Sequence, residues 1–449
     1  MIEISLPHGA TKIINLLTKR GFDAYVVGGC VRDSLYNIPP KDWDICTNAK
    51  PEEMLRCFNG FKVIETGLKH GTITIVLDDG AYEVTTFRTD GVYTDNRHPD
   101  EVWFTNNLQS DLERRDFTIN AMAYNPTVGL VDPFGGQEDL KNRRIACVGN
   151  ADDRFNEDAL RIMRALRFSS CYGFDIEKST EESIHKNVGL LNNIAVERIT
   201  QELIKLLGGM DVLPVLLNYS DVITTIIPEL SPCVGFDQNN KYHQYTVYDH
   251  IAHAVDHYVF RGNNTVVKMA LLLHDIGKPF CYSEDERGGH TYGHNIISHK
   301  IARQVVERLR FDKRTQNEIT ELVLYHDDRI EPTQKSIRRL LNRIGEQQAH
   351  RLLQVRICDC LAHKAGTQNE FIRKCTESID ILSCIIDEAQ CFNLKHLAIN
   401  GTDLINAGIP EGRQIGRILN KLLDLVIEGT IQNQREPLLE LALNERTAV

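Results

Sequence analysis

Two glycines followed by two aspartates restrict the fold of this chain more than any other feature of its sequence. Residues 24–27 are apolar and predict a buried strand, and Gly28 and Gly29 then allow a sharp turn and a close approach to a ligand. Residues 31–36 predict a short helix. Its first amide groups, with Arg32 beside them, suit a phosphate group.

Two carboxylates follow this helix at a spacing typical of a metal site. Asp42 and Asp44 alternate with Trp43 and Ile45, so on a strand both acids project from the same face. Mg²⁺ favours oxygen ligands and usually binds only a few protein side chains, so a pair of carboxylates is well suited to bind it. A solvated strand face is the simpler interpretation of an isolated pair.

A hairpin is predicted next, because alternating runs at 71–77 and 81–87 flank a turn at 78–80. We expect Glu83 to lie on a strand beside the two aspartates, as a third metal-binding or catalytic carboxylate. An outward-facing strand glutamate is the alternative.

A loop and a pair of arginines follow. Residues 90–100 are polar and without periodicity, which predicts a mobile loop.

Arg114 and Arg115 stand at the start of a predicted helix, where two guanidinium groups suit a triphosphate. Asp116 and Asn120 are one helical turn apart and are candidates to reach a ribose. A capped surface helix with incidental charge is the alternative.

The chain is predicted to become helical after a first, mixed α/β domain that ends near Gly149. Residues 155–173 predict one helix in which Asp158 and Arg161 lie on the same side. An ordinary ion pair between neighbouring turns is the simplest interpretation of that pair.

Histidines are concentrated in one part of the helical region. The window 243–299 holds eight of the 16 histidines. Imidazole and carboxylate ligands on several helices are how helical bundles hold transition metals, and such metals activate water for phosphoester hydrolysis. The candidate ligands are His250, His274, Asp275 and Asp359, with His290, His294 and His326 open as ligands of a second metal. A domain kept only for packing is the alternative.

Composition limits the classes of function. The length of 449 residues predicts two to four domains, and a net charge of -11 means that any RNA contact must come from a local patch. The 12 cysteines occur without a CxxC pair, and no secretory segment precedes them, which indicates a reducing, cytoplasmic location. No apolar run approaches the length of a membrane span.

Taken in order, several motifs resemble the bacterial-type (class II) tRNA nucleotidyltransferases of the poly(A) polymerase family. They are GGCVRD, DWDICT, EVTTFR, the DGVYTDNRHP loop, RRDFTINA, EDALRIMRALRF and NGTDLI with GRQIGRIL. The resemblance implies an α+β fold, with a small five-stranded nucleotidyltransferase head followed by an all-helical neck, body and tail. We expect these four parts at 1–149, 150–235, 236–365 and 366–449.

The resemblance also implies an activity, the metal-dependent addition of C, C and A to the 3′ end of tRNA from CTP and ATP. Two Mg²⁺ ions on Asp42 and Asp44 would assist in-line attack at the α-phosphorus, with Glu83 as a helper. The nucleotide would be bound by Gly28, Gly29, Arg32, Arg114, Arg115, Asp116 and Asn120, with Arg164 and Arg167 added by the resemblance.

Base choice has a physical account in Asp158 and Arg161. Cytosine and adenine both present an exocyclic amino donor beside a ring-nitrogen acceptor, which a carboxylate and a guanidinium can recognise together. Uracil and guanine place a carbonyl where the amino group should be, which costs about 1 to 3 kcal/mol.

His250, His274-Asp275 and Asp359 resemble the H…HD…D pattern of the HD phosphohydrolases, within the stretch LLHDIGK. This resemblance implies an HD domain with a divalent transition metal and a second, phosphohydrolase activity on tRNA ends. The alternatives to CCA addition are a poly(A) polymerase, an enzyme adding only CC or only A, an HD phosphohydrolase with a nucleotide-sensing head, and a non-catalytic RNA-binding protein. The DGVYTDNRHP loop favours full CCA addition.

Overall fold

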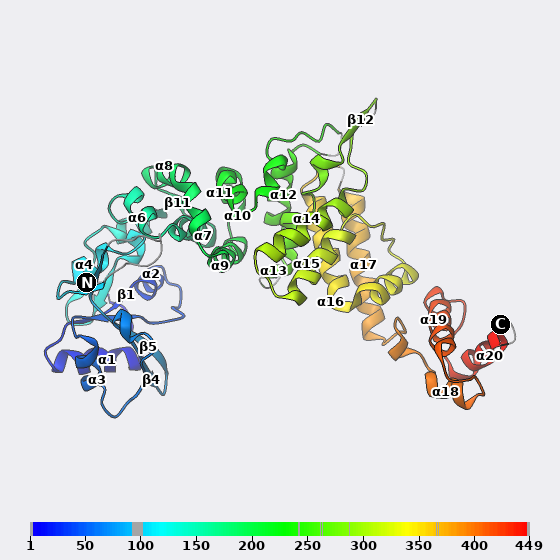
Figure 1. The fold of residues 1–449 in the computed structure, drawn as a ribbon, viewed down its shortest axis with the longest axis horizontal. Coiled ribbons are helices and arrows are strands. Elements are labelled where there is room, and N and C mark those ends of the chain that lie inside the picture. The colour runs from blue at the N-terminus through cyan, green and yellow to red at the C-terminus, as the bar shows by residue number, and fades with distance from the viewer. Residues whose placement is uncertain are drawn as a thin grey trace. The chain divides into compact units, whose positions relative to one another are not determined.

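The computed structural model describes residues 3–91, 102–240, 243–260, 262, 264–286, 288–364, 366 and 368–446. The chain divides into two compact units, Met1–Pro228 and Glu229–Val449 (Figure 1). Most of the predicted loop at 90–100 lies outside the described residues. The division into four parts stays a prediction.

The first unit is built on a mixed sheet of seven strands, in the order β3-β4-β5-β2-β1-β8-β9. Only β2 and β5 pair in parallel, and the other neighbours are antiparallel. The expected five strands are too few, because a short strand extends the sheet at each edge. The strands are β1 (Ala24–Val27), β2 (Ile45–Thr47), β3 (Lys62–Ile64), β4 (Thr72–Leu77), β5 (Gly80–Thr86), β8 (Ala123–Asn125) and β9 (Gly129–Val131).

Three helices pack against this sheet, and the second of them lies close to the helix predicted at 31–36. They are α1 (His8–Lys19), α2 (Gly29–Leu35) and α3 (Pro51–Cys57). The apolar face of α1 is buried with the side chains of the sheet and of α3 in one core. The glycine pair therefore leads directly from a central strand into α2.

The predictions for the aspartate pair and for the start of the arginine segment were wrong. Asp42 and Asp44 do not lie on a strand, because β2 begins at Ile45, whose partner in the ladder is Val26. Arg114 does not begin a helix but follows the end of α4 (Leu108–Glu113).

The chain beyond α4 leaves the helical conformation because its backbone pairs with a distant segment. Val148 donates to the carbonyl of Asp116 at 3.1 Å, and Thr118 donates to that of Ala146 at 3.0 Å. One turn of 3-10 helix, η2 (Thr118–Asn120), precedes β8. Backbone groups that pair in this ladder are not available for helical hydrogen bonds.

Helices dominate the rest of the first unit. The predicted helix at 155–173 is two helices, α6 (Ala151–Glu157) and α7 (Leu160–Tyr172), which are separated at Asp158 and Ala159. Two short strands, β10 (Arg144–Ile145) and β11 (Asp175–Ile176), form a parallel pair, and β11 lies in the region predicted to be wholly helical. The remaining helices are α5 (Gly136–Lys141), α8 (Lys178–Asn187), α9 (Val196–Leu207), α10 (Val212–Asn218) and α11 (Ser220–Ile226).

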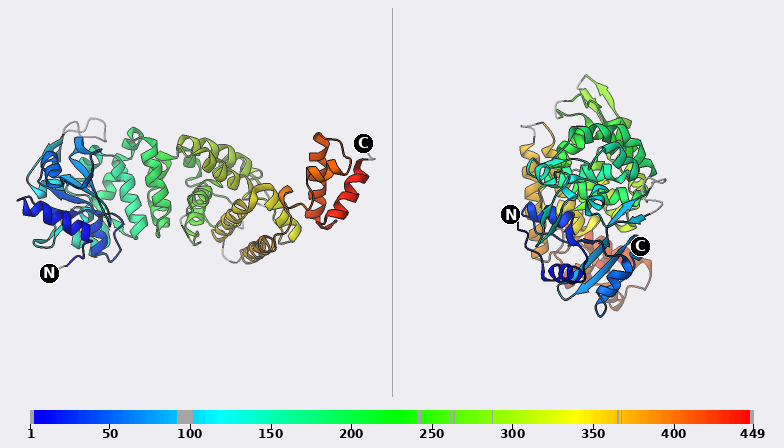
Figure 2. Two further views of the ribbon diagram at one scale, coloured as in Figure 1. Left: turned by 90° about the horizontal axis from the view of Figure 1, so that it is seen from below. Right: turned by 90° about the vertical axis from the view of Figure 1, so that its left-hand side faces the viewer.

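The second unit contains a bundle of helices that pack side by side (Figure 2). They are α12 (Val247–Asp256), α13 (Thr265–Leu273), α14 (His294–Arg308), α15 (Lys313–Tyr325), α16 (Gln334–Leu361) and α17 (Asn369–Asp387). A hairpin of β12 (Ser283–Asp285) and β13 (Gly288–His290) precedes α14 in the chain. Three C-terminal helices enclose a small core of their own, namely α18 (Gly401–Asn406), α19 (Arg413–Glu428) and α20 (Arg435–Arg446). In the described part of the chain, no helix has the length and apolar character that a bilayer span needs.

Candidate functional site

Three acids of the first unit, Asp42, Asp44 and Glu83, lie at or near the parallel pair of β2 and β5, although no candidate metal group in the described part of the chain includes them. Ile45 is opposite Val84, so Asp44 and Glu83 precede paired residues on adjacent strands. Desolvation, then the charges of Glu83 and Asp42, raise the pKa of Asp44, while Arg115 opposes them. This crowding of negative charge is the electrostatic environment that a divalent cation would relieve.

Gly28 lies opposite one of the predicted phosphate-binding arginines. Its φ of 80° is in the region that favours glycine. A Cβ atom at Gly28 would lie 2.9 Å from Nη1 of Arg115, so a side chain there would displace that guanidinium. Gly29 is the first residue of α2.

A buried polar network joins α2 to α7. The Arg32 guanidinium is only 6% exposed, and it donates to Asp33 at 2.7 Å and also to the Asn120 side-chain carbonyl. Asn120 donates to Asp116 at 3.0 Å, and Nε of Arg164 donates to the other oxygen of Asp116 at 2.8 Å. Burial opposes ionisation of Asp116, but Arg164 outweighs it and holds the pKa of that carboxyl well below its usual value.

Six of the predicted nucleotide-binding residues line one open pocket of about 220 Å³. They come from the α4–η2 segment, from the break between α6 and α7, and from α7 itself, and they are Arg114, Arg115, Asp116, Asp158, Arg161 and Arg164. Arg167 is not among these lining residues. Its guanidinium lies 3.9 Å from the ring centre of Phe168 and pairs with Glu202 at 3.2 Å.

The simple interpretation of Asp158 and Arg161 as an ion pair was wrong, because each has another partner. Asp158 pairs with Nη2 of Arg198 at 2.9 Å, while Arg161 pairs with Glu157 at 2.6 Å and donates to the carbonyl of Arg114 at 2.9 Å. Both side chains nevertheless line the same pocket. Sequence reasoning missed Arg198, which lies on α9 and carries no motif signal.

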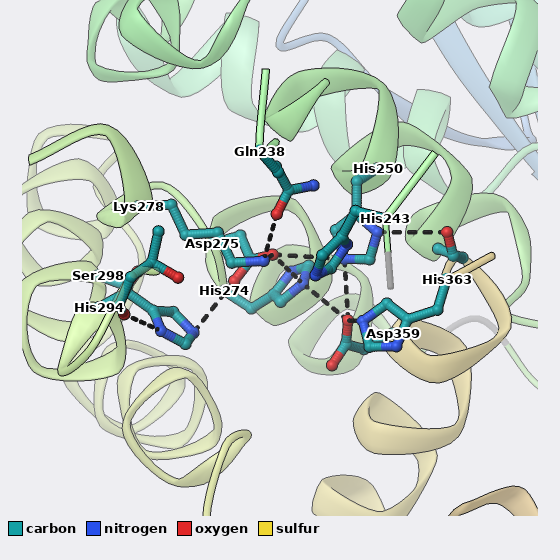
Figure 3. Close-up of polar contacts among 12 residues, drawn as sticks. Gln238, His243, His250, His274, Asp275, Lys278, His294, Ser298, Asp359 and His363 are labelled. Carbon is teal, nitrogen blue, oxygen red and sulfur yellow. Dashed lines mark hydrogen bonds and ion pairs between the residues drawn. The ribbon is translucent and has the colours of Figure 1, made fainter. Parts of the chain in front are cut away.

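The second unit brings four predicted metal ligands together, as Figure 3 shows. One ligand atom from each of His250, His274, Asp275 and Asp359 lies within 4.8 Å of the others. Nε2 of His250 is 2.9 Å from Asp359, and Nε2 of His274 is 3.2 Å from Asp275.

Two further groups share residues with this one. Asp275, His294 and His326 form the second, in which the two imidazole Nε2 atoms are 3.1 Å apart. A third group joins His250 to two residues that sequence reasoning missed, His243 and His363. The spacing of His363, four residues after Asp359, was a helical signal that could have identified it. No described group includes His290, whose Nε2 is 2.9 Å from Asp285.

Hydrogen bonds to the backbone orient three of these imidazoles. The Nδ1 atoms of His274, His294 and His326 lie 2.7, 2.9 and 2.7 Å from the carbonyl oxygens three residues before them. Such contacts fix the ring and leave Nε2 as the ligand atom. Within the described chain, the buried Nε2 of His274 makes no hydrogen bond. These donors fit a divalent transition metal.

The candidate ligands shift one another's pKa values. Burial lowers the pKa of His250 to about 4. Burial also acts against protonation of His274, but Asp275 and Asp359 outweigh it and raise its pKa to about 10. Burial alone would raise the pKa values of the two carboxyls, yet the neighbouring histidines hold both well below the ordinary range. Two carboxylates beside these imidazoles concentrate negative charge that a bound cation would neutralise.

The three groups of candidate metal ligands, called the metal groups below, each contribute residues to the lining of a cavity of about 540 Å³. Its lining includes Asp275, His294, His326 and Asp359, and it continues to the β12–β13 hairpin and the first residues of α14. The cavity is large enough for a small phosphoester beside the metal groups.

Three protein families match separate parts of the chain. Residues 24–146 match the Poly A polymerase head domain, residues 173–233 match the Probable RNA and SrmB- binding site of polymerase A, and residues 294–442 match tRNA nucleotidyltransferase domain 2 putative. The mixed sheet with its acids beside a glycine turn, together with these matches, makes the chain a nucleotidyltransferase.

Known proteins define the family more closely. The CCA-adding enzyme of Ligilactobacillus salivarius is 35% identical over 98% of both chains. That of Geobacillus kaustophilus is 51% identical over 200 residues, which span 44% of this chain and about half (49%) of that relative. The crystal structure of the Bacillus stearothermophilus CCA-adding enzyme in complex with CTP is 29% identical, with a TM-score of 0.72 and coverage of 98% of this chain and 97% of that one. The chain belongs to the CCA-adding enzyme family.

Proposed function

We propose that this protein adds C, C and A to the 3′ end of tRNA, using CTP and ATP and releasing pyrophosphate. Membership of the CCA-adding enzyme family supports the reaction. The observation that carries the proposal is the single pocket lined by six of the predicted nucleotide-binding residues.

The charges near that pocket suit a triphosphate. Arg114 and Arg115 pair with Asp111 at 2.8 and 3.5 Å. These ion pairs hold two guanidinium groups in the lining of the pocket. Asp42 and Asp44, with Glu83 beside them, would hold Mg²⁺. Bound Mg²⁺ would neutralise the triphosphate and make the 3′-hydroxyl of the RNA more acidic.

The same pocket supports base selection by the protein. Asp158 is oriented by Arg198, and Arg161 is oriented by Glu157, so both recognition groups are held before a nucleotide enters. Asp158 would accept from the amino group of cytosine or adenine, and Arg161 would donate to the ring nitrogen.

The reaction is tested with purified protein, Mg²⁺ and three tRNAs: one lacking CCA, one lacking only the final A, and one complete. Labelled CTP and ATP are supplied separately and together. We expect ordered addition that stops at the complete end. Long A tracts would identify a poly(A) polymerase, and extension of only one substrate would identify a partial enzyme. Nucleotide binding without incorporation would identify a sensor or an RNA-binding protein.

We further propose a second function, metal-dependent phosphoester hydrolysis at tRNA ends by the histidine site of an HD domain. The observation that favours it is the set of imidazoles whose Nδ1 atoms are held by backbone carbonyls around buried carboxylates. His250, His274, Asp275 and Asp359 would hold one metal, with His294 and His326 completing a second. Such metals would activate water and neutralise the phosphate.

This function is tested by release of phosphate, and by opening of a 2′,3′-cyclic phosphate, on tRNA ends with Mn²⁺, Co²⁺, Ni²⁺ or Mg²⁺. We expect activity with at least one metal, and we expect its loss in His274→Ala and Asp275→Ala. Equal hydrolysis by the variants and the parent would remove the proposal.

A further inference from the structure

An aromatic pair stands beside the histidine site with one ring open to solvent. Tyr292 is 79% exposed, and its ring stacks on that of His290 with a centroid distance of 5.2 Å and an interplanar angle of 12°. The imidazole beneath it is held by Asp285, 2.9 Å away. Asp285 and Gly288 are paired residues of the β12–β13 hairpin, so the lower ring and the carboxylate that holds it lie on the same short element.

Both rings line the same cavity as the metal groups. His294, a member of one of those groups, follows Tyr292 by two residues. Two residues of extended chain span at most about 7 Å. In a nucleotide, a single ribose separates the phosphate from the base. The spacing therefore suits a ligand whose phosphoester lies at the metal groups while a flat ring lies over Tyr292.

We propose that His290 and Tyr292 form a stacking platform for a nucleobase, so that the cavity selects nucleotides over phosphoesters that carry no base. Every base has a flat π-face, so stacking on an aromatic side chain tolerates any of the four. The proposal rests on the phosphohydrolase function proposed above. It also assigns to His290 a role other than metal binding.

The test compares AMP with ribose 5-phosphate, which differ only in the base, on the full-length protein loaded with the best metal of the panel. We expect Tyr292→Ala to lower kcat/KM for AMP about tenfold, mainly through KM, and to leave ribose 5-phosphate within twofold. Tyr292→Phe should behave as the parent. Phe280→Ala is the matched control, because Phe280 is also exposed, at 56%, but does not line the cavity.

A second variant separates the platform from a metal ligand. His290→Phe keeps a flat ring beneath Tyr292 but removes both nitrogen atoms. We expect it to retain the preference for AMP and the metal content of the parent, and His290→Ala to lose part of that preference. Loss of bound metal in His290→Phe would overturn the proposal, as would equal losses for AMP and ribose 5-phosphate in Tyr292→Ala.

Failure of hydrolysis and failure of the platform can be told apart. If no metal supports hydrolysis of tRNA ends, the second proposed function is wrong. Whenever AMP itself is not hydrolysed, the platform is tested by saturation-transfer NMR of AMP binding. The adenine protons should receive less saturation in Tyr292→Ala than in the parent and in Phe280→Ala. Equal saturation in all three proteins would overturn the platform.

Discussion

At the scale of single residues, the nucleotide pocket holds charged side chains whose partners are already in place. Arg161 and Asp158 each have a separate counter-ion, and Gly28 leaves room for Arg115. Such preorganisation lowers the cost of ordering the side chains when a ligand binds. Changes to single side chains should therefore separate nucleotide chemistry from nucleotide choice.

The first prediction concerns the acid at the parallel strand pair. Asp44→Asn should reduce incorporation of labelled CMP into tRNA lacking CCA by more than about 100-fold, because losing even an outer partner of a metal ligand costs about 10–100-fold. Asp78→Asn, in the turn between β4 and β5, is the matched control and should retain activity. Incorporation by Asp44→Asn within tenfold of the parent would contradict the metal role.

The second prediction concerns base choice. Asp158→Ala should reduce the preference for CTP over UTP by roughly tenfold to 100-fold, since a carboxylate no longer faces the carbonyl of the wrong base. Arg198→Ala should reduce it less, because Arg198 orients Asp158 without contacting the base. Relative kcat/KM values for CTP and UTP measure this effect. Glu197→Ala, an exposed neighbour on α9, is the control, and intact selectivity in Asp158→Ala would exclude the role.

At the scale of elements, the first unit is held around its pocket by contacts between segments that are distant in sequence. The guanidinium of Arg32 on α2 lies over the rings of Phe168 and Tyr172 on α7, at 5.1 and 4.9 Å from their centres. The ion pair of Asp116 and Arg164 joins the η2 segment to the same helix. These contacts connect α2 and the η2 segment to α7.

The third prediction follows from the depressed pKa of Asp116. Folding favours the ionised form, so this carboxyl contributes stability above its ordinary pKa of 3.8, and that contribution is lost as the pH falls through the lower folded value. The free energy of unfolding of Asp116→Asn should therefore differ from that of the parent by a constant amount between pH 8 and about pH 5. The difference should shrink below about pH 4.

Urea unfolding followed by circular dichroism measures this difference. Asp152→Asn is a useful comparison, because Asp152 has a lowered pKa of about 2 but lies outside the pocket and is partly exposed. A difference for Asp116→Asn that already shrinks between pH 7 and pH 5 would show that the pair with Arg164 does not hold the carboxyl ionised.

At the scale of the whole molecule, the two proposed activities belong to different compact units. The nucleotide pocket is formed by residues of Met1–Pro228, and the histidine cavity is formed by residues of Glu229–Val449. Each site takes all its described lining residues from its own unit. The two activities should therefore be separable by mutation.

The fourth prediction is that Asp275→Asn removes the metal of the second unit and abolishes phosphoester hydrolysis, while CCA addition stays within about twofold of the parent. Asp275 belongs to two of the metal groups, so its loss affects both. Metal content by mass spectrometry and incorporation of labelled nucleotides measure the two effects. The reciprocal variant, Asp44→Asn, should retain hydrolysis, and a parallel loss of both activities in either variant would contradict separation.

The sequence by itself determined the elements whose signals are local. The strand at 24–27, the glycine turn, the helix after it and the 72–86 hairpin depend on apolar periodicity and turn residues, which act over a few positions. The convergence of His250, His274, Asp275 and Asp359 was also predicted, because the motif specifies residue types that pack inward from several helices.

Only the tertiary structure decided features that depend on partners far along the chain. Arg114 follows a helix instead of starting one, because the backbone after it pairs with residues 146–148. Arg198 orients Asp158 from α9, 40 residues away. His290 turns toward Asp285, while His243 and His363 join His250. Local sequence fixes what a segment tends to form, but long-range hydrogen bonds and ion pairs select which side chains meet.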